Sequence, residues 1–539
     1  MRLVVDLNRC QGFAQCVFLA PDVFALHGEE ALLFSPRFDE AQRDRVEKAA
    51  AACPVQAILV DYSDEPTSRR SGWSPMSADT DVEVLRREGR IVVVGASLAG
   101  LRAAETLREQ GFTGSLTMIG DERYEPYDRP PLSKQALLGR ARPEDTALPR
   151  RRDIDAEWRL GVAAEGLDRD AKQVRLTNGD TVSYDRLLIT TGTRARPWFH
   201  PEEAALDGVF VLRTRDDSAR LLRKLTGGVS RVLVIGAGFT GSEVASACRE
   251  LGLEVTVAER GPAPLVGALG GVIGAVADRL QRKHGVDLRC GVSVTALEGD
   301  DVGRLKRAHL SDGAVIDVEV AVVSLGAMRN TEWLAGSGVA AGPRGIACDA
   351  GCRVFDVNGI VTDDIYAAGD VARSPHPLFD YQFLALEHWG NAVEQAEIAA
   401  HNMICAGPDR RPHLWLPMFW STQFGVNIKS VGVPTLGDQL VVAQGALAEE
   451  RFVAVYGYRG RIIAAAAFDG AKWLGFYEQQ IASGAPFPPE YRAVDRRTET
   501  LHPIDPAFPD PHLPTHGATV TLTGHSPSER RVAFVPSHA

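Results

Sequence analysis

The pattern of apolar positions changes period several times along the chain, and these changes mark its parts. Two stretches begin with β-branched residues, pass through a glycine turn and continue as an alanine-rich segment: IVVVGASLAGLRAAETL and VLVIGAGFTGSEVASACREL. Each predicts a buried strand followed by a helix. Farther on, VVAQGAL, FVAVYGY and IIAAAAF are strand-like, and KWLGFYEQQIASG is helix-like. The sequence therefore predicts an α/β protein of several domains.

A stretch without apolar periodicity separates a small N-terminal part from the rest. Residues 1–61 end in the strand-like AILVDY, and the following SDEPTSRRSGWSPMSADT is rich in Ser, Asp, Arg and Pro. This composition predicts a linker. At the other end, the stretch after Pro488 carries many Pro, His and Asp residues, and no fold is assigned to it.

Composition narrows the classes of protein that fit this pattern. The chain has 539 residues, of which 45% are hydrophobic and 24% charged, and its net charge is -11. Such a charge argues against a protein that binds nucleic acid by neutralising phosphates. The N-terminus lacks the apolar run of a signal peptide, and no stretch approaches about 18 uninterrupted apolar residues. We therefore expect a cytoplasmic protein with no membrane and no nucleic acid among its partners.

Three of the eight cysteines are spaced as ligands of an iron–sulfur cluster. Cys10 and Cys16 flank the loop CQGFAQC, and Cys53 is followed by Pro54. A bacterial ferredoxin loop has a middle cysteine and a remote Cys-Pro that closes the site, whereas here Phe13 stands at the middle position. Three thiolates fit a [3Fe-4S] cluster, and a [4Fe-4S] cluster would need a fourth ligand from outside the protein. The alternative is three buried structural cysteines.

Two glycine turns predict two nucleotide sites. A G-x-G-x-x-G turn between a strand and a helix brings backbone N–H groups and the positive helix end to a pyrophosphate. A single turn of this kind is also found in tight strand-to-helix connections without a ligand, but two copies favour nucleotide binding. The copies consist of Gly95 and Gly100 with Ser97 at the middle position, and of Gly236, Gly238 and Gly241.

Acidic residues follow both turns at the ends of predicted strands. Glu259 lies 23 residues after Gly236, where a carboxylate can accept hydrogen bonds from an adenosine ribose and repel a 2'-phosphate. NADH is therefore favoured over NADPH, although Arg260 could instead contact a phosphate. Asp121 holds the corresponding place in the first unit, with Glu122 as its substitute.

Two further segments bring charges to the first nucleotide site. YEPYDRPPLSK supplies Arg129 and Lys134 in a loop that its prolines stiffen, and such cations suit a flavin pyrophosphate or ring edge. DDIYAAGDVA ends a predicted strand at Asp370, where a carboxylate can accept a hydrogen bond from a ribityl hydroxyl. These residues predict a flavin nucleotide as the first ligand.

With the paired glycine turns, these segments resemble the FAD-containing ferredoxin reductases of the putidaredoxin reductase type, over about residues 89–488. Residues 1–61, with CQGFAQC and CPVQAI, resemble the small single-cluster ferredoxins that serve bacterial haem-thiolate monooxygenases. The chain is thus similar to a natural fusion of a carrier and its reductase. The resemblance implies an α/β multidomain fold of glutathione reductase type. Its parts would be an N-terminal α+β ferredoxin fold, two doubly wound Rossmann-like domains for FAD and NAD, and a C-terminal α+β domain.

The resemblance also implies domain boundaries. Residues 1–61 are expected to form the ferredoxin domain and 62–88 the linker. After them come the FAD-binding domain (89–205 and 329–408), the NAD-binding domain (206–328), the C-terminal reductase domain (409–488) and a tail of unassigned structure (489–539).

Further site residues are implied by the same resemblance. FAD contacts are carried over to Ala99, Ala164, Arg213 and Trp389. Glu243 is placed near the nicotinamide, and Trp420 beside the flavin where electrons leave toward the ferredoxin. One departure from the family is Arg329, which stands where a proline is usual.

The expected activity is that of an NADH-dependent ferredoxin reductase, in which electrons pass from NADH through FAD to the fused cluster. A disulfide reductase would need a vicinal cysteine pair beside the flavin, and neither PYDRPPLSKQALLG nor the second turn contains one. Cys348 and Cys352 are interpreted as structural. The expected acceptor is a cytochrome P-450 monooxygenase, with a Rieske-type oxygenase as the alternative. A redox-sensing flavoprotein that acts as a binding module is the alternative from another class.

Overall fold

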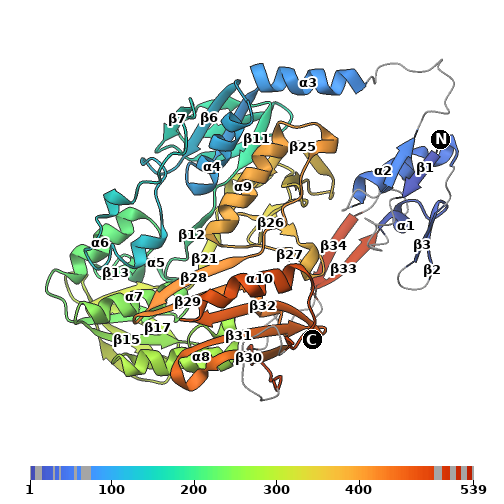
Figure 1. Cartoon of the computed structure of the whole chain (residues 1–539). Coiled ribbons are helices and arrows are strands. Elements are labelled where there is room, and N and C mark those ends of the chain that lie inside the picture. The colour runs from blue at the N-terminus through green and yellow to red at the C-terminus, as the bar shows by residue number, and fades with distance from the viewer. Residues whose placement is uncertain are drawn as a thin grey trace. The chain divides into compact units, whose positions relative to one another are not determined.

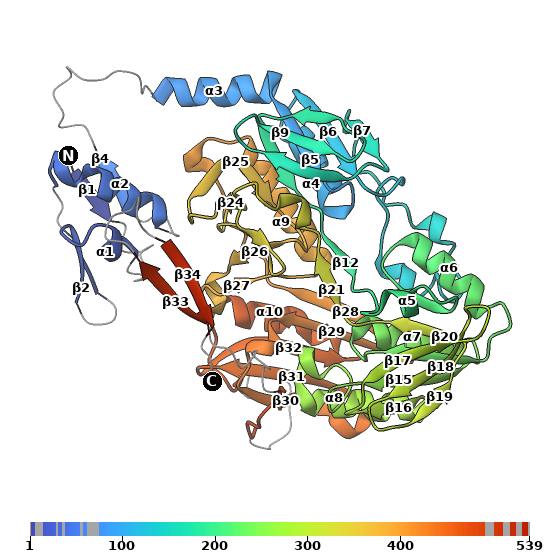
Figure 2. The same cartoon turned by 180° about the vertical axis from the view of Figure 1, so that it is seen from behind.

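The computed structural model describes residues 2–5, 15–27, 31–34, 38–53, 58–61, 75–490, 501–509, 518–523 and 531–536. Internal contacts divide the chain into two units, which are described separately. The first comprises Met1–Arg87 with Cys405–Arg410, and the second comprises Glu88–Ile404 with Arg411–Ala539. Figures 1 and 2 show the elements of both units from opposite sides.

The first unit contains a small α+β fold, as expected for its N-terminal part. Strand β1 (Arg2–Val5) pairs antiparallel with β4 (Ile58–Asp61), and β2 (Phe24–His27) pairs with β3 (Ala31–Phe34). Helices α1 (Gln15–Leu19) and α2 (Arg43–Ala52) contribute apolar side chains to one core, which includes Cys16, Phe24 and Val46. Cys10, Phe13 and Pro54 lie outside the described residues.

Helix α3 (Pro75–Glu88) occupies the second part of the stretch that the sequence predicts as a linker. Its last turn carries Arg86 and Arg87, where the helix dipole favours positive charge. The helix was not predicted, because the Ser and Pro content of the stretch indicated a linker. The predicted linker is therefore helical over this part.

A six-stranded sheet forms the first Rossmann-like domain of the second unit. Its order is β24 (Arg353–Phe355), β25 (Val361–Ala367), β11 (Arg186–Ile189), β5 (Arg90–Val94), β6 (Ser115–Gly120) and β7 (Glu157–Leu160), and every pair except β24 with β25 is parallel. Helices α4 (Leu98–Glu109) and α9 (Trp389–Met403) share one apolar core with this sheet. Strand β5 reads as a continuous run of buried β-branched residues because both faces of the sheet are covered at this strand.

Smaller sheets complete the first domain. Strands β8 (Ala164–Asp168), β9 (Gln173–Leu176) and β10 (Thr181–Ser183) form an antiparallel sheet. Strands β22 (Ala341–Gly342), β23 (Gly345–Ala347), β26 (Ala372–Pro375) and β27 (Phe383–Leu384) form a mixed one.

The second Rossmann-like domain has a parallel sheet in the order β13 (Val209–Val211), β20 (Val320–Val323), β14 (Arg231–Ile235), β15 (Glu254–Glu259) and β16 (Asp287–Cys290). Its helices are α5 (Pro201–Ala204), α6 (Arg215–Leu225), α7 (Phe239–Glu250) and α8 (Val266–Lys283), and β17 (Val294–Gly299), β18 (Leu305–Leu310) and β19 (Val315–Asp317) form an antiparallel sheet beside it. The two Rossmann-like domains are joined by β12 (Thr193–Ala195) and β21 (Ala327–Arg329), which pair antiparallel. Arg329, at the position of the usual proline, thus ends a regular strand.

The C-terminal domain is an antiparallel sheet with one helix. The strand order is β28 (Met418–Gln423), β29 (Val426–Gly432), β32 (Arg461–Phe468), β31 (Arg451–Tyr458) and β30 (Gln439–Ala446), and α10 (Leu474–Ala482) packs on it. This confirms the expected α+β domain and completes the expected fold class.

The tail that received no predicted fold contains ordered backbone in the structure. Ile504 forms an isolated bridge with Leu440, and β33 (Ala518–Thr523) pairs antiparallel with β34 (Arg531–Pro536).

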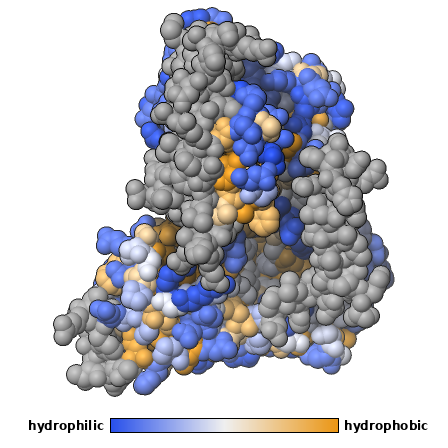
Figure 3. All heavy atoms as spheres, turned by 90° about the vertical axis from the view of Figure 1, so that its right-hand side faces the viewer, coloured by the Kyte–Doolittle hydropathy of each residue, from blue (hydrophilic) through white to orange (hydrophobic). Residues whose placement is uncertain are grey.

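The face drawn in Figure 3 shows apolar side chains in groups among hydrophilic ones. Among the described residues, no helix has both the length and the apolar character needed to cross a membrane.

Candidate functional site

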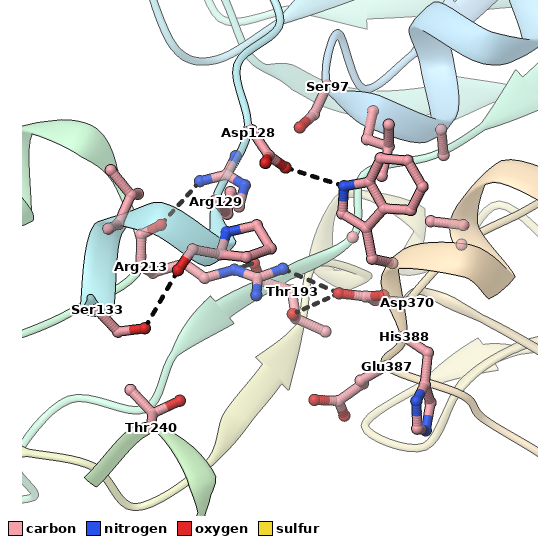
Figure 4. Close-up of a pocket in the computed structure, with 18 of the residues that line it drawn as sticks. Ser97, Asp128, Arg129, Ser133, Thr193, Arg213, Thr240, Asp370, Glu387 and His388 are labelled. Carbon is pink, nitrogen blue, oxygen red and sulfur yellow. Dashed lines mark hydrogen bonds and ion pairs between the residues drawn. The ribbon is translucent and has the colours of Figure 1, made fainter. Parts of the chain in front are cut away.

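A cavity of about 290 Å³ lies where the three domains of the second unit meet. Its wall is made by the N-terminal end of α4, the 3-10 helix Pro130–Ser133, the start of α7, the N-terminal end of α9 and strand β28 (Figure 4). Eight of the predicted site residues line it: Ala99, Arg129, Lys134, Arg213, Glu243, Asp370, Trp389 and Trp420.

The first glycine turn is shaped by close backbone packing. Gly95 has φ +122°, and a Cβ there would lie 2.2 Å from the carbonyl oxygen of Thr190. A Cβ on Gly100 would lie 2.1 Å from the carbonyl oxygen of Gly95. Only glycine fits at these two places. Ser97, at the middle position, is the N-cap of α4 and lines the cavity, so the substitution leaves the turn open to a ligand.

The second turn leaves its middle position open. Gly236 has φ +99°, and added Cβ atoms on Gly236 and Gly241 would lie 2.6 and 2.0 Å from backbone oxygens. By contrast, no atom lies within 4 Å of a Cβ built on Gly238. The first and third glycines are thus required by the fold, and the free space at the second fits the close approach of a pyrophosphate.

Glu259 binds the second turn directly. Its carboxylate accepts hydrogen bonds from the N–H of Ala237 at 2.7 Å and from the N–H of Gly261 at 2.6 Å. The side chain therefore fixes the turn in addition to any contact with a ribose, whereas Arg260 is exposed. The ribose contact itself stays a prediction.

Besides the glycines of the two turns and Glu259, the predicted residues Asp121 and Ala164 lie outside the wall of the cavity as described. Asp121 is exposed at the end of β6, and its carboxylate accepts a hydrogen bond from the N–H of Glu122 at 3.0 Å. Glu122 instead pairs with Arg129 at 2.6 Å. Ala164 begins β8, away from the residues that line the cavity.

Oppositely charged side chains pair with each other at the wall of the cavity. Arg213 donates to Asp370 at 2.9 Å, and Thr193 donates to the same carboxylate oxygen at 3.4 Å (Figure 4). Glu387, which the sequence argument missed, also lines the cavity and accepts from Arg329 at 3.0 Å. Burial and the neighbouring Asp370 raise the pKa of Glu387.

His388 is a second cavity residue that the sequence argument missed. It is the N-cap of α9, and burial lowers its pKa. Its Nδ1 is buried and has no hydrogen-bond partner among the described residues. An unpaired buried ring nitrogen is costly, and a cofactor with polar groups would supply a partner. The only sequence signal was the position of EHW directly before an alanine-rich helix.

Two tryptophans lie edge to face at the cavity. The ring centroids of Trp389 and Trp420 are 6.2 Å apart, with an angle of 65° between the planes. The indole N–H of Trp389 donates to Asp128 at 2.9 Å, and burial raises the pKa of that carboxyl group. Trp420 lines the cavity and is also 39% exposed. It is therefore not a fully buried core residue, and it connects the cavity with the surface.

Glu243 is buried at the junction of the three domains. Its carboxylate accepts from Ser133 Oγ at 2.5 Å, from Ser421 Oγ at 2.6 Å, and pairs with Lys134 Nζ at 2.8 Å. Ser133 and Ser421 were not predicted, because nothing local in the sequence shows which side chain a hydroxyl will meet. These bonds satisfy a buried charge and join the three domains.

Cys16 and Cys53 occupy defined places in the first unit. Cys16 is buried on α1, and Cys53 ends α2, where its N–H donates to Ala50. Cys10 lies outside the described residues, and the three-cysteine ligand set stays a prediction. Elsewhere, burial raises the pKa of Cys248 to about 12 and raises that of Cys348 and Cys352. Such thiols are poor nucleophiles.

Three stretches of the chain match known families. Residues 89–396 match the family described as pyridine nucleotide-disulphide oxidoreductase, residues 3–60 a 4Fe-4S single cluster domain, and residues 418–500 the reductase C-terminal family. The second of these matches supports an iron–sulfur cluster in the N-terminal part, and the three-iron form stays a prediction.

Curated proteins similar to the chain cover most of its length. It is 35% identical over 410 residues to the ferredoxin–NAD(+) reductase component of the anthranilate 1,2-dioxygenase system of Burkholderia cepacia, with 73% of this chain and 94% of that protein covered. It is 31% identical over 390 residues to putidaredoxin reductase of Pseudomonas putida, with coverages of 69% and 87%. Among solved structures, it resembles a chain of the covalent putidaredoxin reductase–putidaredoxin complex, with TM-score 0.69, 28% identity, and coverages of 74% and 94%.

Proposed function

This chain belongs to the pyridine nucleotide-disulphide oxidoreductase family, as an NADH-dependent ferredoxin reductase fused to an iron–sulfur ferredoxin domain, and we propose that it supplies electrons to a haem-thiolate monooxygenase. The observation that carries this proposal is the fusion itself. One polypeptide holds both a single-cluster domain and the reductase, which keeps the carrier at an effective concentration of about millimolar if the connection is flexible.

FAD, when bound, supplies the capacity to accept a hydride and to release electrons singly. The residues that we propose to hold it are Ser97 and Ala99 at the first turn, Arg129, Lys134 and Arg213 among the cations, and Asp370 and Trp389 near the start of α9. The N-terminal end of α9 lies at the cavity, where the helix dipole favours negative charge. His388 offers its unpaired Nδ1 in the same place.

NADH is proposed to bind at the second turn, where Gly238 leaves space for the pyrophosphate. Glu243 is proposed to lie near the nicotinamide, since it is at the start of α7 and lines the cavity. Lys134, Ser133 and Ser421 hold its carboxylate in one orientation.

Trp420 is proposed to mark the side of the cavity from which electrons leave. It reaches both the cavity and the surface, and its indole is polarizable and apolar. For the cluster, we propose a [3Fe-4S] centre held by Cys10, Cys16 and Cys53, because Phe13 takes the place of a fourth ligand.

An experiment can distinguish the proposed electron acceptor, a haem-thiolate monooxygenase, from the alternative acceptor, a Rieske-type oxygenase. The purified protein with NADH should reduce a haem-thiolate monooxygenase under carbon monoxide, giving the absorbance band near 450 nm of that haem type. A Rieske-type oxygenase is the second candidate, favoured by the dioxygenase system named for one relative. Faster reduction of the Rieske centre than of the haem would overturn the first choice. If the purified protein reduces neither oxygenase, the result would favour a role as a redox sensor.

A further inference from the structure

A short segment of the tail joins the C-terminal sheet to the second Rossmann-like domain. We call residues 501–509 the strap. The N–H of Ile504 donates to Leu440 O at 2.9 Å, and the N–H of Leu440 donates to Ile504 O at 2.8 Å. Because Leu440 lies in the edge strand β30, the strap extends that sheet by one bridge.

The strap next reaches a kink in α8, which lies beside β30 and β31 in both views (Figures 1 and 2). Gly270 interrupts the helix with φ +79° and ψ 166°. Beyond it, the N–H groups of Gly271 and Val272 donate to the strap carbonyls of Ala507 at 2.8 Å and of Pro506 at 3.3 Å. The first amides after a helix break have no partner within the helix, so the strap supplies one to each.

The contact leaves no room for a side chain at the kink. A Cβ on Gly270 would lie 2.3 Å from the carbonyl oxygen of Pro506, which is itself buried. Phe508 packs near Tyr456 of β31, with ring centroids 6.3 Å apart, and the Tyr456 hydroxyl donates to Leu269 O at 2.7 Å. Helix α8, the strap and the C-terminal sheet therefore share one closely packed region.

Helix α8 in turn fixes the second glycine turn through Ala237. The N–H of Leu265, the N-cap of α8, donates to Ala237 O at 3.0 Å. Gln281, near the other end of α8, donates to Ser242 Oγ at 3.0 Å, and that hydroxyl donates to Ala237 O at 3.3 Å. Glu259, which accepts from the Ala237 N–H, begins the loop that leads into α8.

We propose that the strap is a positioning element for the dinucleotide: it holds the kink of α8 to β30 and thereby keeps the Ala237 turn in the conformation that binds NADH. The inference rests on the NADH site of the proposed function. Without the strap, the kink and the turn would sample more conformations. Only a fraction of the molecules would then hold the turn in the form that binds NADH, and the apparent affinity for NADH would fall. The reaction after binding would be unaffected, because none of the strap residues lines the described cavity.

A pair of substitutions at Ala507 tests this proposal. Ala507 has φ +56°, a conformation that a β-branched residue resists and glycine adopts freely. Ala507→Val should therefore open the strap, and Ala507→Gly should keep it closed with both carbonyl acceptors in place. Ile504→Pro opens it independently by removing the N–H that donates to Leu440. His502→Ala, at an exposed strap position, is a further control.

The readouts are amide hydrogen exchange and steady-state kinetics of the full-length holoenzyme, with ferricyanide as acceptor at the flavin. In Ala507→Val and Ile504→Pro, exchange at Gly271 and Val272 should speed up. The KM for NADH should rise about three- to tenfold, which lies within the range of typical coupling energies. The values of kcat and FAD content should stay within about twofold, and Ala507→Gly and His502→Ala should match the unsubstituted protein.

Faster exchange at Gly271 and Val272 with an unchanged KM for NADH would overturn the proposal. Unchanged exchange in both opening variants would also overturn it, since the strap would then not protect these amides. The NADH site is tested separately in the unsubstituted protein, where NAD+ should slow exchange at residues 236–241. Absence of that protection would contradict the NADH site rather than the strap.

Discussion

The ammonium group of Lys134 lies 2.8 Å from the carboxylate of Glu243, so an ion pair with little solvent exposure joins the first Rossmann-like domain to the second. Ser421 of the C-terminal domain donates to the same carboxylate at 2.6 Å. All three domains of the second unit thus meet at one buried charge.

Lys134→Met should lower stability, because it leaves a buried carboxylate without its counter-ion, at a cost of about 3 kcal/mol. The change would be measured as the guanidinium midpoint of the holoenzyme. Lys134→Met combined with Glu243→Gln should recover much of the loss, since the unpaired charge is then gone. Arg282→Ala, in the exposed pair with Asp278, is the matched control and should cost less than about 1 kcal/mol. Equal losses for Lys134→Met and Arg282→Ala would contradict this account of the junction.

Trp420→Ala should separate the two half-reactions. Reduction of the flavin by NADH should be nearly unchanged in anaerobic stopped flow, while reduction of the cluster slows and ferricyanide reduction survives. Trp473→Ala, in the same domain but outside the cavity wall as described, is the control and should slow neither step. If Trp420→Ala loses FAD or slows both steps equally, Trp420 is a packing residue and electrons leave elsewhere.

Glu259→Gln should narrow the preference for NADH over NADPH. The loss of charge removes repulsion of the 2'-phosphate, an effect worth roughly ten- to hundredfold in the ratio of the two kcat/KM values. The amide oxygen of glutamine can still accept one of the two backbone hydrogen bonds that Glu259 makes, so the turn is better preserved than in Glu259→Ala. Equal use of both dinucleotides by the unsubstituted protein would mean that Arg260 determines the choice.

The cluster should contain three irons per ferredoxin domain, with an electron paramagnetic resonance signal near g = 2 when oxidised, as is typical of this cluster type. Phe13→Cys should add a fourth thiolate and favour four irons, because thiolates are the usual ligands of a [4Fe-4S] cluster. The number of irons per cluster in both proteins is measured by iron and sulfide analysis after anaerobic purification. Four irons in the unsubstituted protein, with no change in Phe13→Cys, would refute the assignment.

Stability should fall as the pH drops below about 6.5, partly because of His413. Burial lowers the pKa of His413 to about 4, so the unfolded chain binds a proton at a pH where the folded protein does not. Stability is therefore full above the unfolded pKa and decreases down to the folded pKa, by roughly 3 kcal/mol in total. His413→Gln should show a shallower loss of thermal midpoint between pH 7 and pH 5. If the thermal midpoint of His413→Gln falls with pH as steeply as that of the unsubstituted protein, groups other than His413 cause the loss of stability.

The glycine turns were predictable because their requirement is local. Gly95 and Gly236 have positive φ values, and a side chain at Gly100 or Gly241 would collide with the glycine five residues earlier. The spacing of the glycines in the sequence is therefore enough to predict the two turns. The same is true of the strands that precede these turns, since buried parallel strands need continuous apolar runs.

The partners of Glu243 and the strap were not predictable for the opposite reason. Ser421 meets Glu243 across 178 residues of sequence, and a lone serine in a strand carries no sign of its partner. The strap, LHPIDPAFP, combines three prolines with scattered apolar residues and shows neither the helix nor the strand period, and its main contacts are made by backbone groups, which every residue has. Such contacts depend on the assembled fold rather than on residue type.

The paired strands β12 and β21 make the second Rossmann-like domain an insertion whose entry and exit lie side by side. Ala195 and Ala327 are direct neighbours across this pair, although the whole domain separates them in sequence. An inserted module with adjacent ends can be removed and replaced without displacing its host. The domain between these strands is therefore a natural unit for exchange, and a graft from a reductase of different nucleotide preference could change the electron donor while the cavity residues contributed by the host domain and the fused carrier stay the same.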